Sequence, residues 1–337
     1  MDNITIKTLA AKLGTSVATV SKALRDSHEI SAETKQRVRE MANELGYVPN
    51  LYASSLKKRK SKTIAVVLPA VADSFFSQAI NGIESVAQQK GYHVLIYLTH
   101  ENLQKEQEIL KEFQSGRVDG MLMSISSESD NYQHILNLHQ HGMPIVFFDR
   151  CCEEIDTAQI STNDFECGYN AAQHLIAAGC RRIGVLSISN SLCIINKRMA
   201  GCEKALAEHG LQLIANDIVL CGANDAQNIT AIKKVLADEN RPDGVILTVE
   251  KLAITCYLAC EELGLAIPDD VKMVCFSNSQ AVSIFNPSLT TVTQPAFEIG
   301  AAAAAILFKA LAKPSLNLKK ESVVIPSQLI VRNSSSN

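Results

Sequence analysis

The stretch Thr5–Leu24 reads TIKTLAAKLGTSVATVSKAL and joins two short amphipathic segments through a glycine. Thr5 and Ser16 are residue types that cap helix N-termini, and Gly14 is the type that ends a helix in a tight turn. Two short helices joined in this way predict a helix-turn-helix unit. Apolar residues recur at the spacing of one helix face, namely Ile6, Leu9, Ala10 and Leu13, then Val20, Ala23 and Leu24.

A third helix is predicted downstream. Ser31 can cap it and Gly46 can end it. Its buried face would consist of Val38, Met41, Ala42 and Leu45. The spacing of apolar residues alone would also fit any other three-helix bundle.

The exposed face of the second helix favours contact with DNA. Most of its residues are small, so this face could enter a major groove. Val17 and Ala18 can contact thymine methyl groups, and Lys22 can donate to O6 and N7 of guanine. Phosphates could be bound by the hydroxyls of Ser16, Thr19 and Ser21.

Charge is unevenly distributed along the chain. Residues 1–60 contain eleven Lys and Arg against six Asp and Glu, a net charge of +5, whereas the remaining residues carry −8. A basic head on an acidic body is expected where only the head meets a polyanion, because neutralisation of phosphates drives such binding. A basic surface that faces only solvent would show the same balance.

These head residues resemble the signature of the LacI/GalR family of transcription regulators. The resemblance is carried by Thr5–Leu24, by ISAETKQRV at 30–38 and by LGYVPN at 45–50, and it runs nearly without gaps over the first 60 residues. Two residues depart from it, since Lys22 replaces a common Arg and Arg25 replaces a common Asn. Lys lacks the guanidinium fork, which makes a bidentate guanine contact less secure.

The segment Pro49–Leu56 matches the hinge helix of that family. Eight residues are too few for a stable isolated helix in water. In the family this helix orders on operator DNA and wedges a Leu into the minor groove, which kinks the duplex, and Leu56 is the matching position. The alternative is an interdomain linker with incidental apolar residues. Lys57–Lys60 fits a linker and a phosphate contact in either case.

The resemblance implies a homodimer that binds a pseudo-palindromic operator as a repressor. One short helix reads too few bases, and two half-sites multiply discrimination. The residues expected to contact operator DNA are Thr5, Ser16, Val17, Ala18, Thr19, Ser21, Lys22, Arg25, Asn50, Ala53, Leu56 and Lys57.

The acidic body repeats one plan twice. Gly, Glu and Gly follow Ile64 at offsets of 18, 20 and 27, and they follow Ile183 at the same offsets. Likewise, RVDG at 117–120 precedes the apolar run MLM, and RPDG at 241–244 precedes VIL. A strand, a crossover helix and a further strand therefore recur, which predicts two similar doubly wound parallel α/β lobes behind the all-α head.

Two such lobes leave a cleft at the carboxyl ends of their strands, where open sheets bind ligands. The plan resembles the type I periplasmic binding proteins, whose fold LacI/GalR cores share, and it covers residues 62 to about 332. By this resemblance the chain crosses between lobes near 160–162, 290–293 and 322–326, and closure over a ligand would move the hinge helices. The expected domains are a helix-turn-helix head at 1–47, a hinge helix and linker at 48–60, and a core at 61–337, with a first lobe at about 61–160 and 293–322 and a second at about 162–290 and 326–337.

Effector contacts are expected where strand ends face the cleft. Arg198 matches an Arg that grips the effector in the family, with an ion pair between lobes as the alternative. One of the two adjacent Phe residues could pack in the core, and Asp149 belongs to a family Asp-Arg pair that could be structural. The expected effector residues are Asp73, Ser74, Phe75, Phe76, Ser124, Ser126, Asp149, Arg198, Glu250 and Ser277.

Two departures leave the identity of the effector open. Many family members have Asn-Asp where this chain has Glu250-Lys251, and Asp where it has Ser277, so the Asp that often holds sugar hydroxyls is absent. The chain also has no Trp to stack on a sugar face. The resemblance therefore implies a small, sugar-like effector without naming it.

Other classes of protein are not indicated. The ten cysteines form no C-x-x-C pair, so we expect free thiols, no metal site and no cofactor.

With no apolar run of roughly 18 residues and no signal-peptide pattern, we expect a cytoplasmic protein, nucleoid-associated on its operator and without a membrane partner. Catalytic motifs such as G-x-S-x-G are absent, so we expect no enzyme, and His134, His139 and His141 are expected to be solvated. An architectural DNA-binding protein without ligand control is the alternative function.

Overall fold

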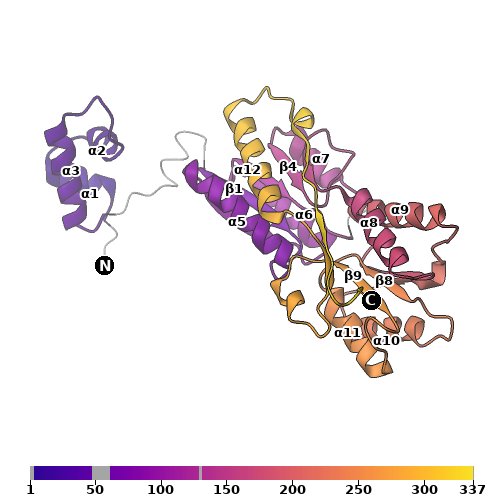
Figure 1. Cartoon of the computed structure of the whole chain (residues 1–337). Coiled ribbons are helices and arrows are strands. Elements are labelled where there is room, and N and C mark those ends of the chain that lie inside the picture. The colour runs from indigo at the N-terminus through magenta and orange to yellow at the C-terminus, as the bar shows by residue number, and fades with distance from the viewer. Residues whose placement is uncertain (1–3, 48–60, 129–130, 337) are drawn as a thin grey trace. The chain divides into compact units, whose positions relative to one another are not determined.

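The computed structural model describes residues 4–47, 61–128 and 131–336. The chain separates into two compact units, one ending at Ser61 and one beginning at Lys62. The first unit contains α1 (Ile6–Leu13), α2 (Val17–Leu24) and α3 (Ala32–Glu44) (Figure 1). Its small core consists of Leu9, Ala10, Val20, Ala23, Val38 and Ala42. These are the apolar faces that the sequence predicts.

The second unit begins with a six-stranded sheet. Its strands are β1 (Thr63–Leu68), β2 (His93–Leu98), β3 (Gly120–Met123), β4 (Ile145–Phe148), β5 (Ala158–Ser161) and β11 (Val323–Val324). They run parallel in the order β11-β5-β4-β3-β1-β2. β1, β3 and β4 are buried along their whole length. Continuous apolar strands are expected where helices cover both faces of a parallel sheet.

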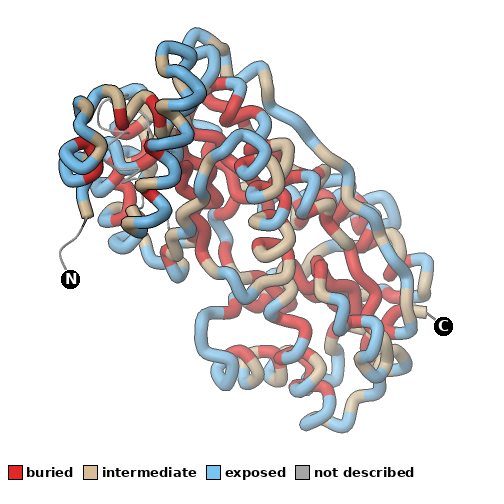
Figure 2. Tube along the Cα trace, turned by 90° about the vertical axis from the view of Figure 1, so that its left-hand side faces the viewer, coloured by how far each residue is buried: buried red, intermediate tan, exposed pale blue. Residues whose placement is uncertain are grey.

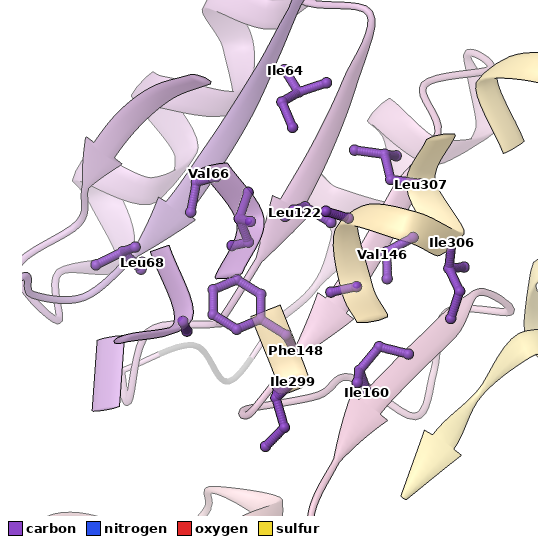
Figure 3. Packing of buried hydrophobic residues seen from close by; sticks show 14 of the residues in the cluster. Ile64, Val66, Leu68, Leu122, Val146, Phe148, Ile160, Ile299, Ile306 and Leu307 are labelled. Carbon is purple, nitrogen blue, oxygen red and sulfur yellow. The ribbon is translucent and has the colours of Figure 1, made fainter. Parts of the chain in front are cut away.

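Helices cover both faces of this first sheet. One face packs against α5 (Ser74–Gln89) and α12 (Ala296–Ala312), where Ile64, Val66 and Leu68 of β1 meet side chains such as Ile299 and Leu307 (Figure 3). The other face packs against α6 (Leu103–Phe113) and α7 (Gln133–Gln140). Alternate residues of β1 thus enter two separate cores, as the two-residue period of a strand requires.

A second six-stranded sheet repeats this plan. Its strands are β6 (Ile183–Ser187), β7 (Ile218–Leu220), β8 (Gly244–Leu247), β9 (Lys272–Phe276), β10 (Thr290–Thr293) and β12 (Gln328–Ile330). The order is β12-β10-β9-β8-β6-β7, and only the β10–β12 pair is antiparallel. Its helices are α8 (Asp164–Ala177), α9 (Cys193–Glu208), α10 (Asp225–Leu236) and α11 (Leu252–Leu263). The predicted fold class is confirmed.

Glycines explain why the sequence repeat is visible. A Cβ added to Gly82 would lie 2.1 Å from the carbonyl oxygen of Phe297, and one added to Gly201 would lie 2.0 Å from that of Phe165. These two positions let α5 pack on α12 and α9 pack on α8 in backbone contact. The later pair, Gly91 and Gly210, has φ values of 65° and 68°, which a residue without a Cβ adopts at little cost. Each repeated glycine therefore has the same structural role in both lobes.

Three short segments of chain connect the two sheets. They lie between β5 and α8, between β10 and α12, and between β11 and β12. The crossing expected at 290–293 falls just after those residues, because β10 hydrogen-bonds to β9 and β12 of the second sheet. Buried segments run through the middle of this unit and exposed segments over its surface (Figure 2). Among the described helices, none is long and apolar enough to cross a membrane.

Candidate functional site

Side-chain caps fix the two helices of the candidate DNA-reading unit. The Thr5 hydroxyl accepts a hydrogen bond from the Thr8 amide at 3.3 Å, and the Ser16 hydroxyl accepts one from the Thr19 amide at 3.1 Å. Between them, Gly14 has a φ of 65° and its amide bonds back to Ala10 and Ala11. The entry angle of α2 is therefore set by this glycine turn and by the cap at Ser16.

The N-terminal end of α2 presents small side chains to solvent. Ser16, Val17 and Ala18 are exposed, and the apolar side chain of Val17 is 41% accessible. The opposite face, with Val20 and Ala23, is buried in the core of the head. An exposed valine in the first turn of a helix could contact a thymine methyl group if that helix enters a major groove.

Several polar groups of α2 are already paired within the head. The Lys22 ammonium forms an ion pair with Glu29, which lies in the loop before α3. Arg25 donates from Nε to the carbonyl oxygen of Ser21 at 3.0 Å and from Nη2 to its hydroxyl at 2.5 Å. These side chains must exchange their internal partners for base edges or phosphates if they contact DNA.

Four of the predicted DNA contacts lie outside the described residues. Asn50, Ala53, Leu56 and Lys57 all belong to the segment 48–60, as does the predicted hinge helix. Their roles stay predictions from the sequence.

The second unit contains a cleft between its two sheets. Its cavity volume is about 30 Å³, room for little more than one water molecule, so a small-molecule ligand enters only when the lobes move apart. Both lobes contribute, and most of the lining residues are at or just beyond strand ends or near helix N-termini. The lining residues are Asp73, Phe75, Phe76, Asp149, Arg150, Ile194, Arg198, Val249, Glu250, Phe276, Ser277, Asn278 and Gln294.

Arg198 on α9 is 3% exposed and has one unused nitrogen. Its Nε donates to Asp164 at 2.8 Å, and its Nη1 donates to the carbonyl oxygen of Thr248 at 2.5 Å. The guanidinium carbon lies 4.0 Å from the centre of the Phe276 ring. Nη2 has no hydrogen-bond partner among the described residues. A buried donor without a partner costs about 1–3 kcal/mol, so an acceptor entering the cleft would relieve this cost.

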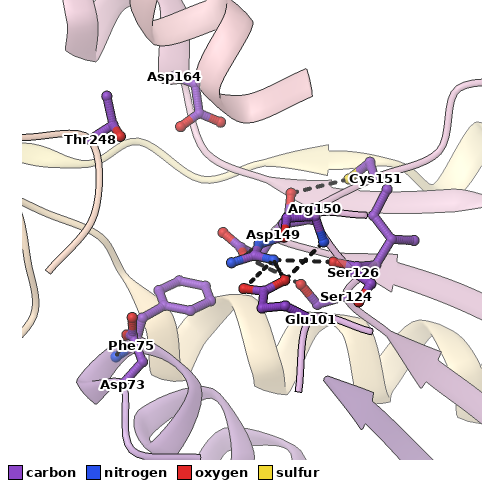
Figure 4. Close-up of polar contacts among 12 residues, drawn as sticks. Asp73, Phe75, Glu101, Ser124, Ser126, Asp149, Arg150, Cys151, Asp164 and Thr248 are labelled. Atoms are coloured by element: carbon purple, nitrogen blue, oxygen red, sulfur yellow. Dashed lines mark hydrogen bonds and ion pairs between the residues drawn. The ribbon is translucent and has the colours of Figure 1, made fainter. Parts of the chain in front are cut away.

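A second charged cluster lies under the first lobe's side of the cleft (Figure 4). Arg150 donates from Nη1 to both carboxylate oxygens of Glu101, at 3.0 and 2.7 Å. Its neighbour Asp149 has a φ of 60° and accepts a hydrogen bond from the Ser124 hydroxyl at 3.3 Å. Burial raises the pKa of Asp149 to about 6, although the guanidinium of Arg150 opposes this shift.

Hydrogen bonds between residues of the two lobes connect the two sides of the cleft. Oε1 of Glu250 accepts from the amide of Ser74 in the first lobe at 3.2 Å. Its Oε2 accepts from the Ser277 hydroxyl at 2.8 Å and the Asn278 backbone amide at 2.9 Å, both within its own lobe. The side chain of Gln78 on α5 donates to the backbone carbonyl oxygen of Asn278 at 3.2 Å and accepts from the side-chain amide of Asn278 at 3.3 Å. The bonds from Ser74 to Glu250 and between Gln78 and Asn278 hold the lobes together across the cleft.

The structure brings most of the predicted effector residues together. Asp73, Phe75, Phe76, Asp149, Arg198, Glu250 and Ser277 line the cleft. Ser74 reaches it only through its backbone amide, and Ser124 and Ser126 are fully buried behind it. Ser124 holds Asp149, while the Ser126 amide donates to Glu106 at 2.8 Å.

Sequence reasoning missed part of the lining. Arg150 and Asn278 directly follow predicted site residues, so their position at strand ends was the available signal. Ile194 and Gln294 offered no such signal, because their place depends on how the two lobes meet. The prediction for His134 was wrong: its Nε2 lies 2.8 Å from an oxygen of the fully buried Glu106, so the ring is packed against α6. All ten cysteines are free, as expected.

Comparison with known proteins supports the same reading of both units. Residues 5–50 match the model of the bacterial regulatory proteins, lacI family, and residues 172–335 match that of the periplasmic binding protein-like domain. The repressor PurR of Edwardsiella ictaluri is 31% identical over 89% of this chain and 88% of its own length. The ribose operon repressor of Haemophilus influenzae is 28% identical over 98% of each chain.

A solved structure extends the likeness to the whole fold. The lac repressor dimer bound to operator and the anti-inducer ONPF superposes with a TM-score of 0.87, at 21% identity, over the full length of both chains. The capped helix-turn-helix head, the two doubly wound sheets and the family matches agree. The chain belongs to the LacI family of DNA-binding transcription regulators.

Proposed function

We propose that this chain is a homodimeric repressor that binds a pseudo-palindromic operator, with its DNA affinity controlled by a small, sugar-like effector in the cleft. The observation that carries the effector site is the unused Nη2 of Arg198, which is buried at the wall of the cleft between the two lobes. Hydroxyl oxygens of a sugar are acceptors that this donor lacks. The name of the relative from Haemophilus influenzae, which refers to a ribose operon, is consistent with a sugar.

The proposed DNA contacts divide by chemistry. Val17, Ala18 and Lys22 would read base edges in the major groove, whereas Thr5, Ser16, Thr19, Ser21 and Arg25 would bind phosphates. In the hinge segment, Leu56 would wedge into the minor groove, with Asn50, Ala53 and Lys57 around it. Base contacts give sequence preference, and phosphate contacts give the salt dependence of binding.

An apolar face on the second lobe supports the homodimer. Ile254 and Leu258 on α11 are 61% and 40% exposed, and Ile284 is 83% exposed. Beside them runs a groove lined by Tyr257, Phe285 and other apolar residues. We assign this face to a second copy of the chain, because a two-fold dimer presents two α2 helices to the two halves of a palindrome.

The effector would act through closure of the lobes. Three chain segments cross between the lobes, so the lobes can rotate about them. A ligand that bridges Arg198 in one lobe and Asp73 in the other favours the closed arrangement by its differential affinity for it. In a dimer, closure changes the distance between the two segments that lead to the heads.

Selection of bound fragments from genomic DNA by the purified full chain tests this proposal. The expected result is a pseudo-palindromic consensus, bound by a dimer, whose affinity changes when a small metabolite binds the core. A consensus without two-fold symmetry would contradict the dimer. A chain whose operator affinity responds to no compound that it binds would contradict effector control.

A further inference from the structure

The cleft contains more negative charge than its own cations balance. Asp73, Asp149 and Glu250 line it together with the two guanidinium groups of Arg150 and Arg198, and no Lys or His is among its described lining residues. The lining itself therefore has three acidic side chains against two cationic ones.

Both guanidinium groups, however, already have an acidic partner behind the lining. Glu101 holds Arg150 at 2.7 Å, and Asp164 holds Arg198 at 2.8 Å. These two carboxylates cancel the charge of the two cations. The three carboxylates of the lining are left without a full cationic partner, because Arg150 Nε lies 3.8 Å from Asp149 and makes no hydrogen bond.

Two of these carboxylates come from opposite lobes and approach each other. Glu250 of the second lobe accepts a hydrogen bond at 3.2 Å from the amide of Ser74, the residue next to Asp73. Burial and the nearby carboxylate of Glu250 both raise the pKa of Asp73. Two ionised carboxylates that meet as the lobes close repel each other, unless a cation or a proton lies between them.

A metal ion does not fit this place. Among the described residues, no group of three or more His, Cys, Asp or Glu side chains is arranged to hold one. An ammonium group has three donors on one cationic nitrogen, so it can bond to carboxylates from two sides. It also restores the charge balance that the lining lacks.

The unused Nη2 of Arg198 adds a second requirement. It is a buried donor, so the same ligand must carry an acceptor, and a hydroxyl oxygen supplies one without new charge. Phe75, Phe76 and Phe276 give the remaining walls an apolar character suited to a compact carbon skeleton. A sugar phosphate would instead bring further negative charge to three carboxylates.

We infer that the effector is an aminated polyol, such as an amino sugar, with its ammonium group between Asp73 and Glu250 and a hydroxyl on Arg198. This inference rests on the proposed function, in which the cleft is the effector site. It narrows the sugar-like effector of the proposed function to a cationic one.

Matched pairs of probes test the inference on the full chain at pH 7. Titration calorimetry and thermal shifts compare D-glucosamine with D-glucose, D-galactosamine with D-galactose, and D-mannosamine with D-mannose. N-acetyl-D-glucosamine and D-glucosamine 6-phosphate separate the effect of charge from that of size. At least one free amine should bind ten times more tightly than its neutral partner and should raise Tm.

Variants then tie that preference to the two carboxylates. Glu250→Gln and Asp73→Asn should each weaken binding of the amine at least tenfold and leave binding of the neutral partner within threefold. Glu239→Gln, an exposed carboxylate outside the cleft, is the matched control and should bind like the parent chain. Two variants are used so that a folding defect in one, visible as a lowered Tm, does not decide the result.

Three outcomes overturn the inference. In the first, no free amine of the panel binds. In the second, a neutral or phosphorylated sugar binds more tightly than its amine partner. In the third, both cleft variants bind the amine as tightly as the parent chain does. A neutral sugar that binds and alters operator affinity would leave the proposed function intact. Ligands that bind without any change in operator affinity would instead remove the proposed function.

Discussion

The guanidinium of Arg198 is buried with a carboxylate, a carbonyl oxygen and an aromatic ring around it, and one of its nitrogens stays unbonded. Arg198→Lys keeps the positive charge beside Asp164 but removes the planar fork and the free donor. We expect effector affinity to fall roughly 10- to 100-fold, the value of one charge-assisted hydrogen bond.

Calorimetry with the effector and fluorescence anisotropy with operator DNA measure the two functions of Arg198→Lys separately. Operator affinity without effector should stay within about threefold of the parent chain. Arg241→Lys, whose guanidinium pairs with Asp270 outside the cleft, serves as the control for loss of an Arg fork. Unchanged effector affinity in Arg198→Lys would exclude Nη2 from ligand binding.

Asp149 makes stability depend on pH. The pKa of Asp149 is about 6 in the folded chain, against 3.8 for an Asp that is not buried, chiefly because the carboxylate is buried. Between these values the folded state binds more protons than the unfolded state, so this group stabilises the fold below pH 4 and loses that contribution as pH rises through 6. At most about 3 kcal/mol is involved, from two pKa units.

Asp149→Asn should remove this dependence, because Asn keeps the shape, carries no charge and tolerates the left-handed backbone at this position. Urea unfolding at pH 4.5 and pH 8 is the measurement. The fall in unfolding free energy between the two pH values should be about 1–3 kcal/mol smaller than in the parent chain. The exposed Asp269→Asn should not alter it, and an identical fall in Asp149→Asn would disprove the assignment.

At the scale of elements, a close helix contact of the second lobe lies at Gly201. A Cβ there would lie 2.0 Å from the carbonyl oxygen of Phe165 and 2.7 Å from the amide of Tyr169. Gly201→Ala must therefore push α9 away from α8, and we expect a loss of about 2 kcal/mol or more in the free energy of unfolding. Effector affinity should fall as well, since α9 carries Arg198.

Gly222→Ala is the matched control for this substitution, because a Cβ there meets no atom within 4 Å and φ is not in the left-handed region. Its unfolding free energy should change by less than about 0.5 kcal/mol. Equal effects of the two substitutions in urea unfolding would show that helix contact is not what Gly201 provides.

In the head, an ion pair with the loop before α3 occupies the ammonium group of Lys22, one of the residues proposed to contact bases. Glu29 pairs with Lys22 on α2 in an exposed ion pair, which is worth up to about 1 kcal/mol. Glu29→Gln should free Lys22 and remove one negative charge near the DNA, so operator affinity should rise up to about fivefold. Anisotropy over a salt titration measures this, with the exposed Glu44→Gln as control. A fall in affinity would mean that Glu29 positions Lys22 for DNA.

Local rules predicted the elements well. The caps at Thr5, Ser16 and Ser31 and the stop at Gly14 lie where the sequence places them, because such signals act over three or four residues. The repeat at Gly82 and Gly201 predicted two similar lobes because close helix packing tolerates no side chain at either position.

The parts of the site that escaped prediction depend on distant segments. Gln294 reaches the cleft through hydrogen bonds with Asn278, sixteen residues earlier. The ring of His134 packs against Glu106, a charged residue of α6 whose side chain is fully buried. Such pairs cannot be predicted from a local pattern. The spacing of apolar residues indicates which face of an element is buried, but it does not indicate which polar group of another element lies opposite that face.

For the whole molecule, the apolar face on α11 predicts self-association. Leu258→Glu places a charge in the proposed interface, so we expect a shift from dimer to monomer in analytical ultracentrifugation and a loss of specific operator binding of at least tenfold. Leu220→Glu, an exposed apolar residue on the edge strand β7, is the control and should remain dimeric. If Leu258→Glu formed a dimer as stable as that of the parent chain, the interface would have to lie on another face.

The coupling between cleft and operator tests the central claim most directly. Effector affinity is measured by calorimetry with and without operator DNA, and operator affinity by anisotropy with and without effector. Linkage requires the same factor in both experiments, and couplings of 1–3 kcal/mol correspond to about 5- to 150-fold. We predict a factor of at least five in the parent chain, equal in both directions, and in Arg198→Lys an operator response that appears only at roughly 10- to 100-fold higher effector concentration. Effector bound in the cleft with no change in operator affinity would contradict the account.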